Sequence, residues 1–351
     1  MKAFILSLFY LFLLQESIQA LDKPESIIMN IYYSNGKYKT VKSDKVYDEA
    51  IANAIYNKSY ETTGWDFLTI TSYDKKDNKY SDSNKAYAMG YLEGVLTKDR
   101  IYTFYRNIKF TGLYDDNENL IKFMKENLNY MNETSLKNRD TDPYWEHIHY
   151  ILQQFKGLYD GYTSVAEKEK LISFEDFIIL SSYTDADDAK NYMGTSLLNY
   201  REMTTEEIRK NFILNSRCSA LVKLANDYSD LWFGHATWDY YNVMIRIFKE
   251  YRFVSNKGNE NNKVIVFPSY PAVLFSTDDF YYLDSKLLVM ETSINIFDID
   301  LYKEMKPKSV LTWVRIMLAN ILAKSAEDWI EYFKKENSGT YNCQFTILDL
   351  H

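Results

Sequence analysis

The sequence is poor in cysteine, because only Cys218 and Cys343 occur among its 351 residues. Two cysteines are too few for a disulfide framework, so the stability of the chain has to come from a packed core. A single Cys218–Cys343 disulfide stays open as an alternative to a free thiol. The 11 glycines and 5 prolines are also sparse, and no repeat or Pro-rich tract indicates a flexible linker.

The chain also lacks clusters of basic residues, and its formal net charge is −8. Binding of nucleic acid needs clustered Lys and Arg, so nucleic acid is not expected as a partner. Metal ligands are scarce as well. His147 and His149, beside Glu146, would place two ligands on one face of a strand, but no third ligand is evident. We therefore expect no metal and no other cofactor.

Apolar residues make up 46% of the chain and aromatic residues 17%, which is enough for a large core in one domain or two closely packed ones. The longest apolar run, Ala3 to Leu14, follows Lys2 and precedes a polar, small-residue stretch that ends at Ala20. This order is typical of a signal peptide over residues 1–20. The run is shorter than the ~20 residues that cross a bilayer, so no transmembrane anchor is expected.

Entry into the secretory route makes two sequons candidate glycosylation sites. They are Asn57-Lys58-Ser59 and Asn132-Glu133-Thr134. Glycosylation would place both asparagines on the surface.

The segment around Cys218 indicates a hairpin. Residues 219–224 and 231–233 are β-compatible runs, separated by a turn-rich stretch. If the turn centres between Asn226 and Asp227, Cys218 lies directly opposite His235. Opposed residues in an antiparallel pair have Cβ atoms roughly 4.5–5.5 Å apart, so the thiol and the imidazole could share one site.

A thiol attacks as its thiolate, and therefore needs a neighbouring base. His235 could supply one. A second base would arise if the chain were cut between Arg217 and Cys218, because the new α-amine would be bonded to the Cα of the nucleophile itself. The alternative to a catalytic role is that Cys218 is a small buried residue of the core.

Other runs predict a mixture of strands and helices. Strands are expected over residues 27–33, 67–72, 264–267 and 286–290, and the near-continuous apolar content of the first hairpin favours burial on both of its faces. Helices are expected over residues 309–323 and after the capping residue Ser325. Two more are expected where apolar residues recur at helical spacing, one through Leu120, Met124, Leu128 and Met131 and the other through Trp238, Tyr241, Ile245 and Phe248.

Several segments, which follow one another in the family's order, resemble the phospholipase B-like family of lysosomal and secreted N-terminal-nucleophile hydrolases, as does the Cys218-Ser219-Ala220-Leu221 context. The segments are Thr63-Gly64-Trp65, 88–94, 142–145, 157–162, Ser269-Tyr270-Pro271, 278–281, Met290-Glu291-Thr292, Leu311-Thr312-Trp313 and 337–342. They span nearly all of residues 60–350.

The resemblance implies an α+β fold, the four-layer α-β-β-α sandwich of N-terminal-nucleophile hydrolases. It also implies self-cleavage between Arg217 and Cys218, with Cys218 as the nucleophile. Residues 21–217 would form the N-terminal fragment, and residues 218–351 the nucleophile-bearing part of the sandwich. Family members continue further, so the sandwich is expected to be incomplete at the C-terminus of this chain.

Further site residues are assigned by position. His235 would orient the thiol or bond the substrate, with Trp238 as a pocket wall. Thr292 is a pocket candidate, and Asn337 and Asn342 are candidate oxyanion donors, although amides in turns often bond their own backbone.

The function that the resemblance implies is release of fatty acids from phospholipid esters by a secreted or lysosomal enzyme. The partners would be a phospholipid or another acylated small molecule, with the cleaved fragments remaining associated. An N-acyl amide hydrolase of the same fold and a truncated, catalytically silent lipid-binding homologue are the alternatives.

Overall fold

The computed structural model describes residues 25–72, 79–113, 118–193, 199–215, 218–294 and 296–351. The predicted signal peptide and Arg217 lie outside these described residues. The structure is therefore silent on both the leader and the predicted cleavage junction.

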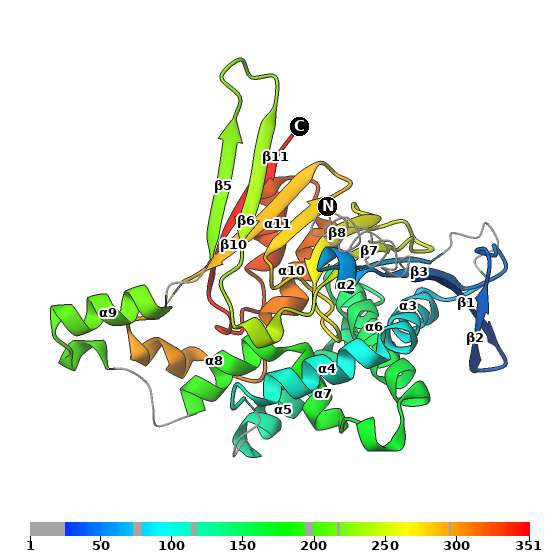
Figure 1. Cartoon of the computed structure of the whole chain (residues 1–351), viewed down its shortest axis with the longest axis horizontal. Coiled ribbons are helices and arrows are strands. Elements are labelled where there is room, and N and C mark those ends of the chain that lie inside the picture. The colour runs from blue at the N-terminus through cyan, green and yellow to red at the C-terminus, as the bar shows by residue number, and fades with distance from the viewer. Residues whose placement is uncertain (1–24, 73–78, 114–117, 194–198, 216–217, 295) are drawn as a thin grey trace, which may run out of the picture.

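The centre of the described structure is a nine-stranded sheet in the order β11-β10-β9-β8-β7-β4-β3-β1-β2 (Figure 1). Its strands are β1 (Glu25–Ser34), β2 (Lys37–Ser43), β3 (Ala52–Lys58), β4 (Asp66–Ser72), β7 (Ile247–Arg252), β8 (Val264–Ser269), β9 (Phe280–Leu283), β10 (Leu287–Ser293) and β11 (Cys343–Asp349). Neighbouring strands are antiparallel except β4 and β7, which pair in parallel. That pair joins the parts before and after Cys218 into one sheet.

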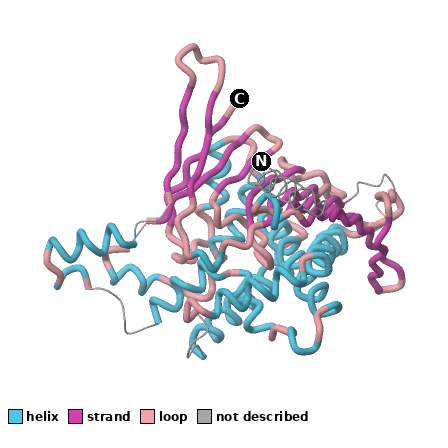
Figure 2. The backbone as a smooth tube through the Cα atoms, viewed as in Figure 1, coloured by secondary structure: helices cyan, strands magenta, loops and turns pink. Residues whose placement is uncertain are grey.

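Helices gather on one side of this sheet (Figure 2). The α-helices are α2 (Tyr60–Thr63), α3 (Asp82–Leu96), α4 (Lys98–Lys109), α5 (Glu118–Asn138), α6 (Pro143–Val165), α7 (Phe174–Ser181), α8 (Tyr183–Met193), α9 (Thr205–Asn215), α10 (Thr312–Leu322) and α11 (Ala326–Phe333). Short 3₁₀ turns are η1 (Lys168–Lys170), η2 (Tyr200–Glu202), η3 (Tyr241–Val243) and η4 (Ile299–Glu304). Among the described helices, none combines the length and apolar character that crossing a bilayer requires.

Helices α3 and α6 pack with their backbones in close contact, because glycines line the crossing. A Cβ added to Gly90 would lie 1.8 Å from the carbonyl oxygen of Gln154, and one added to Gly157 would lie 2.0 Å from that of Tyr87. Small residues let helix backbones approach closely. These glycines set the spacing of the helical layer beneath the sheet.

Several predicted elements are confirmed. Strands β1, β4 and β8 and helix α5 cover the expected runs, β10 begins one residue after the start of its expected run, and α10 lies within the predicted range 309–323. Helix α11 begins after Ser325, whose side chain accepts a hydrogen bond from the Asp328 amide, as its capping role predicts. The predicted α+β class is confirmed.

The predicted helix through Trp238, Tyr241, Ile245 and Phe248 is wrong. Residues 237–240 are irregular, Tyr241 begins a 3₁₀ turn, and β7 follows. In β7 buried and less buried residues alternate from Ile247 onward. Period-two burial fits a strand, and pairing with β4 overrides the helical spacing that the sequence also allows.

The hairpin that follows Cys218 is a separate two-stranded sheet of β5 (Ser219–Leu224) and β6 (Leu231–Ala236). It stands beside β10 and β11 in Figure 1, and the rings of Phe233 and Phe280 lie 5.1 Å apart where β6 meets β9. The predicted burial on both faces is wrong. Every residue of β5 is exposed, and Leu221 is 57% exposed, because the described residues supply no layer that covers the hairpin.

The four-layer sandwich stays a prediction. The described residues form one large sheet, a helical layer and a hairpin stacked at one end of that sheet.

Candidate functional site

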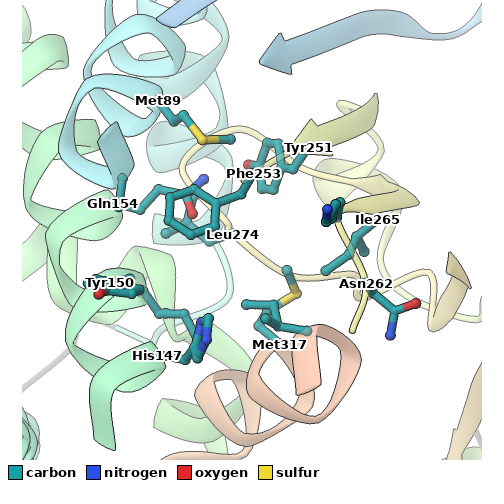
Figure 3. Close-up of a pocket in the computed structure, with 14 residues that line it drawn as sticks. Met89, His147, Tyr150, Gln154, Tyr251, Phe253, Asn262, Ile265, Leu274 and Met317 are labelled. Carbon is teal, nitrogen blue, oxygen red and sulfur yellow. The ribbon is translucent and has the colours of Figure 1, made fainter. Parts of the chain in front are cut away.

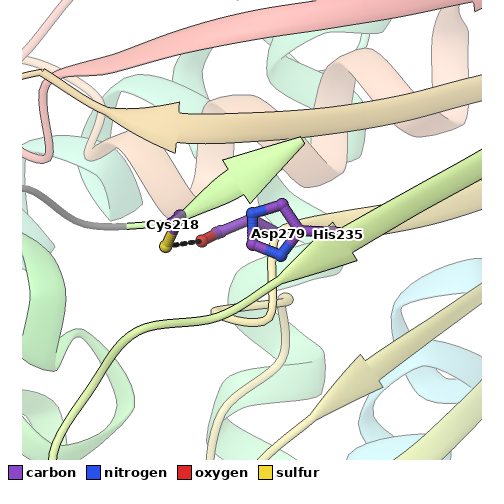
Figure 4. A group of neighbouring side chains, drawn as sticks. All are labelled: Cys218, His235 and Asp279. Carbon is purple, nitrogen blue, oxygen red and sulfur yellow. Dashed lines mark hydrogen bonds between the residues drawn. The ribbon is translucent and has the colours of Figure 1, made fainter. Parts of the chain in front are cut away.

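A thiol, an imidazole and a carboxylate meet where the hairpin touches the large sheet. Cys218 precedes β5, His235 lies on β6, and Asp279 precedes β9. One ligand-type atom from each lies within 4.8 Å of the other two (Figure 4). The Cys218 thiol is directed at Asp279, with Sγ 4.0 Å from Oδ2. The fold thus brings together residues 61 positions apart in the sequence.

The hairpin register differs from the predicted one by two residues. His235 pairs with Ala220, so the predicted direct opposition of Cys218 and His235 is wrong. The turn centres one residue later than the sequence indicated. Residues two apart on a strand share a face, so Cys218 and His235 still face the same side as diagonal neighbours.

Two buried carboxylates share one phenol beside this cluster. The Tyr341 hydroxyl lies 2.6 Å from Oδ1 of Asp279 and 2.5 Å from Oε1 of Glu291. A phenol carries a single proton and can donate to only one of these oxygens. Asp279 and Glu291 thus compete for the one hydroxyl proton of Tyr341.

Burial and neighbouring charge shift the pKa values of two groups at this site. Burial raises the pKa of Asp279 well above its usual range, and the nearby charges of Glu291 and Cys218 raise it further. Burial, Glu291 and Asp279 likewise raise the pKa of the Cys343 thiol, whose Sγ lies 3.1 Å from the Tyr341 carbonyl oxygen. Cys343 is therefore held as a neutral thiol next to the carboxyl pair.

His235 is held as a neutral base. Burial lowers its pKa, while the backbone and the charge of Glu291 oppose that effect. Nδ1 lies 3.4 Å from the Thr237 hydroxyl, and Nε2 makes no hydrogen bond within the described part of the chain. One ring nitrogen is thus available for a proton or another ligand.

The backbone of the site is strained. Cys218, Asp279 and Tyr341 have φ values of 64°, 55° and 47°, in the left-handed region that non-glycine residues rarely adopt. Such residues each cost on the order of 1–3 kcal/mol and gather at functional sites. Three of them in contact mark this cluster as the candidate site.

The remaining predicted pocket residues lie around the cluster. Thr292 is half-buried on β10, next to Glu291 and therefore on the opposite face of the strand. Asn337 accepts a hydrogen bond from the Gly339 amide, and Asn342 donates to the Ile294 carbonyl, so both amides are engaged with backbone. Trp238 is 55% exposed after β6. Their roles stay predictions.

The alternative of a Cys218–Cys343 disulfide is not realised, because neither cysteine is disulfide-bonded in the structure. The two predicted glycosylation sites lie within regular elements. Asn57 is half-buried on β3, and Asn132 is half-buried on α5. Glycosylation of either asparagine stays a prediction.

His147 and His149 lie on α6, so their predicted strand placement is wrong. Two positions along a helix turn about 200° around its axis, which separates their rings. Nε2 of His147 bonds Oδ1 of Asn259, whereas Nε2 of His149 lies 2.9 Å from Arg139 and 3.0 Å from Ser83. They share no ligand position.

Asp279, Glu291 and Tyr341 received no role from the sequence. Each nevertheless belongs to a segment that carried the family resemblance. Glu291 directly follows the apolar residues 287–290 on β10, and this was an available signal because a buried carboxylate needs a hydrogen-bonding or charged partner.

An apolar pocket lies apart from the cluster, between α3, α6 and α10 (Figure 3). Its lining includes Met89, His147, Phe253, Ile265 and Met317. It shares no residue with the Cys218 cluster, so it is a separate feature of the molecule.

The fold and the site together define an α+β protein with a cysteine-centred polar cluster at the junction of a hairpin and a large sheet. The phospholipase B family model matches residues 52–351, and the chain belongs to that family.

Curated relatives agree with this assignment. Phospholipase B-like protein C of Dictyostelium discoideum is 36% identical over 93% of this chain and 58% of its own length. Protein B of the same organism is 37% identical over 86% of this chain and 52% of its own, and phospholipase-B 81 of Drysdalia coronoides is 32% identical over 85% and 54%. The chain spans about half the length of the curated relatives it matches.

Proposed function

We propose that the chain is a phospholipase B-like acyl hydrolase that releases fatty acids from phospholipid esters, with Cys218 as its nucleophile. The observation that carries this proposal is the meeting of Cys218, His235 and Asp279 at one point of the fold, within 4.8 Å. The printed names of the relatives suggest the phospholipid substrate. The signal-peptide pattern suggests work in a secreted or lysosomal setting.

The reaction begins with loss of the thiol proton of Cys218. His235, a neutral base beside the thiol, accepts that proton in the uncut chain. Asp279 in its protonated form can donate a hydrogen bond to the resulting thiolate across the 4.0 Å that separates Sγ and Oδ2.

Sγ then adds to the ester carbonyl carbon and forms a tetrahedral oxyanion. Collapse of this adduct breaks the ester C–O bond, and the departing alkoxide takes up the proton that the base accepted from Cys218 and leaves as the alcohol. Water attacks the thioester next, which releases the fatty acid and restores the thiol. Asn337 and Asn342 remain the candidate oxyanion donors.

Self-cleavage between Arg217 and Cys218 belongs to the same proposal. Sγ would attack the Arg217 carbonyl carbon, shift the acyl group from nitrogen to sulfur, and release it to water. The freed α-amine would then serve as the base. Pairing of β4 with β7 supports lasting association of the two fragments, since these strands lie on opposite sides of the junction.

Two alternatives use the same site. An N-acyl amide hydrolase would need only a different leaving group at the tetrahedral stage. A silent lipid-binding homologue is favoured by one observation, the exposure of the apolar β5 strand.

The test is fatty acid release from phosphatidylcholine vesicles, measured by mass spectrometry together with the mass of the Cys218 peptide after acid quench. We expect fatty acid, an acyl adduct on Cys218, and a fragment that begins at Cys218. Cys218→Ala should abolish all three, and His235→Ala should slow formation of the fragment that begins at Cys218 by about 10²–10⁴.

His351→Ala is the matched control, because His351 forms an exposed imidazole–carboxylate pair with Asp349 far along the chain. It should leave release unchanged. Undiminished release by Cys218→Ala would refute the nucleophile, while activity on N-acyl amides alone would select the amidase. No turnover together with vesicle binding would select the silent homologue.

A further inference from the structure

The cluster at Cys218 has the composition of a metal site as well as that of a nucleophile. We propose that Cys218, His235 and Asp279 bind one zinc ion, which holds the thiolate and reversibly blocks its attack. Binding itself stands on the geometry alone, and only its inhibitory consequence rests on the proposed function.

The distances are close to those that zinc requires. Zinc lies about 2.3 Å from thiolate sulfur and about 2.0–2.2 Å from imidazole nitrogen or carboxylate oxygen. In a tetrahedral site this places sulfur and oxygen about 3.6 Å apart. Sγ of Cys218 and Oδ2 of Asp279 are 4.0 Å apart here, and a ring nitrogen of His235 completes a set within 4.8 Å. Small side-chain rotations would close the site.

The charge of the surroundings points to a cation independently of the ligand set. Asp279 is 2% exposed and Glu291 is 1% exposed, and neither forms an ion pair with any described Lys or Arg. Oε2 of Glu291 has no hydrogen-bond partner within the described residues. Buried carboxylates are normally paired with cations or coordinate metals.

The ligand types select the metal. Thiolate and imidazole favour zinc over magnesium and calcium, which prefer oxygen ligands. Three protein ligands leave the fourth tetrahedral position for water, since no fourth His, Cys, Asp or Glu joins the set among the described residues. The pair His147 and His149 is excluded, because each ring has a separate set of partners.

Binding has a defined proton balance. Zinc takes the thiolate form of Cys218 and the carboxylate form of Asp279, so the thiol proton and a proton held by Asp279 pass to solvent. The sulfur lone pair that would attack an acyl carbonyl then lies in the bond to zinc. Removal of the ion by a chelator returns the free thiol, and no oxidant or reductant is involved.

The test is titration of metal-free protein with zinc in competition with a chromophoric chelator, alongside cobalt(II) titration followed by absorption. We expect one zinc per chain and a sulfur-to-cobalt charge-transfer band. Cys218→Ala should abolish the band. Asp279→Asn removes a direct ligand, so it should weaken zinc binding by more than the loss of an outer-shell partner, which typically costs about 10- to 100-fold.

His351→Ala is again the matched control, and it should bind zinc as tightly as the native chain. Cys218→Ser, which is nearly isosteric, replaces Cys218→Ala if the alanine variant does not fold. Binding of less than one zinc per chain would overturn the site, and so would a charge-transfer band that survives in both Cys218 variants.

The outcomes separate this site from the proposed hydrolase. An acyl adduct on Cys218 without zinc binding would overturn the metal site and leave the hydrolase intact. Zinc binding without any acyl adduct would support the metal site and count against the hydrolase.

Discussion

His235 lies diagonally across the hairpin from Cys218, because it pairs with Ala220 two residues further along β5. Diagonal neighbours on one face are roughly 7–8 Å apart at the backbone, within reach of an imidazole ring. A register slip of two residues preserves the face, whereas a slip of one would have turned the thiol away from the ring. The contact between these side chains therefore depends on whether the register shifts by an even or an odd number of residues, and less on the position of the turn.

The two cysteines should differ in reactivity toward iodoacetamide. Burial and the carboxyl pair raise the pKa of Cys343 well above its usual range, so little of it is thiolate at pH 8. We expect Cys218 to be modified first, as mapped by peptide mass spectrometry, and both to react alike in urea. Faster labelling of Cys343 in the folded chain would contradict this assignment.

The glycine-lined crossing of α3 and α6 should tolerate no side chain. Gly90→Ala would drive a methyl group into the Gln154 carbonyl oxygen at 1.8 Å, and only backbone movement could relieve that contact. We expect a loss of at least about 3 kcal/mol in the free energy of unfolding, measured by urea denaturation.

Gly234→Ala is the control for this crossing, since nothing lies within 4 Å of a Cβ at that position. It should change the free energy of unfolding by less than about 1 kcal/mol. Equal losses in the two variants would show that the close approach of α3 and α6 does not limit stability.

Local patterns predicted many of the elements but not their surroundings. The hairpin after Cys218, the helix through Leu120 and Met124, and the cap at Ser325 follow from short-range chemistry, and all three are present. The segment from Trp238 to Phe248 failed because its helical spacing competes with a period-two pattern, and pairing with β4 decides between them.

The candidate site likewise combines contacts that local sequence predicts with contacts that depend on long-range strand pairing. Cys218 and His235 are close in sequence and joined by a hairpin, so their meeting could be predicted from turn chemistry. Asp279 and Tyr341 lie just before β9 and β11, far along the chain from Cys218, and their contact depends on the order of the nine-stranded sheet. No single-sequence pattern encodes that order.

His149 should make the protein less stable in acid. Burial and the Arg139 charge lower its pKa from 6.5 to about 4. Between these values the unfolded chain binds the extra proton, so the free energy of unfolding falls as pH drops from about 6.5 to about 4. We expect about 2 kcal/mol from this residue once solvent screening near Arg139 is allowed for.

Urea denaturation at pH 7 and at pH 4.5 measures this effect, and His149→Gln is the comparison because glutamine can still accept from Arg139 but does not titrate. The difference in stability between the two pH values should be smaller in the variant. An identical difference would assign the acid sensitivity to other groups.

The buried ion pair between Glu93 and Lys249 should be the strongest single interaction between α3 and β7. Nζ of Lys249 lies 2.7 Å from Oε1 of Glu93, and both side chains are fully buried. Lys249→Met would leave the Glu93 carboxylate in the core without its cation. It should lower the free energy of unfolding, measured by urea denaturation, by about 3–5 kcal/mol. Lys334→Ala breaks an exposed pair with Glu331 and should cost less than about 1 kcal/mol. A small loss in Lys249→Met would contradict a large contribution of this ion pair to stability.

The parts on either side of Cys218 should stay together after the chain is cut. A protease site introduced at residues 216–217 allows a cut at will, and native size-exclusion chromatography then compares the product with its denatured fragments. Strand β4 pairs with β7 from Asp66 opposite Ile247 to Thr71 opposite Arg252, so separation would break the sheet at its centre.

The expected result is a single native peak that contains both fragments and splits only in denaturant. Helix contacts add to the sheet, because the Asn127 side-chain amide donates to the carbonyls of Pro307 and Ser309, each at 2.9 Å. In the Lys249→Met variant the cut chain should separate at a lower urea concentration. Two native peaks would show that the covalent link, rather than the sheet, holds the halves together, and a site built from Cys218, His235 and Asp279 would then have to survive on the second fragment alone.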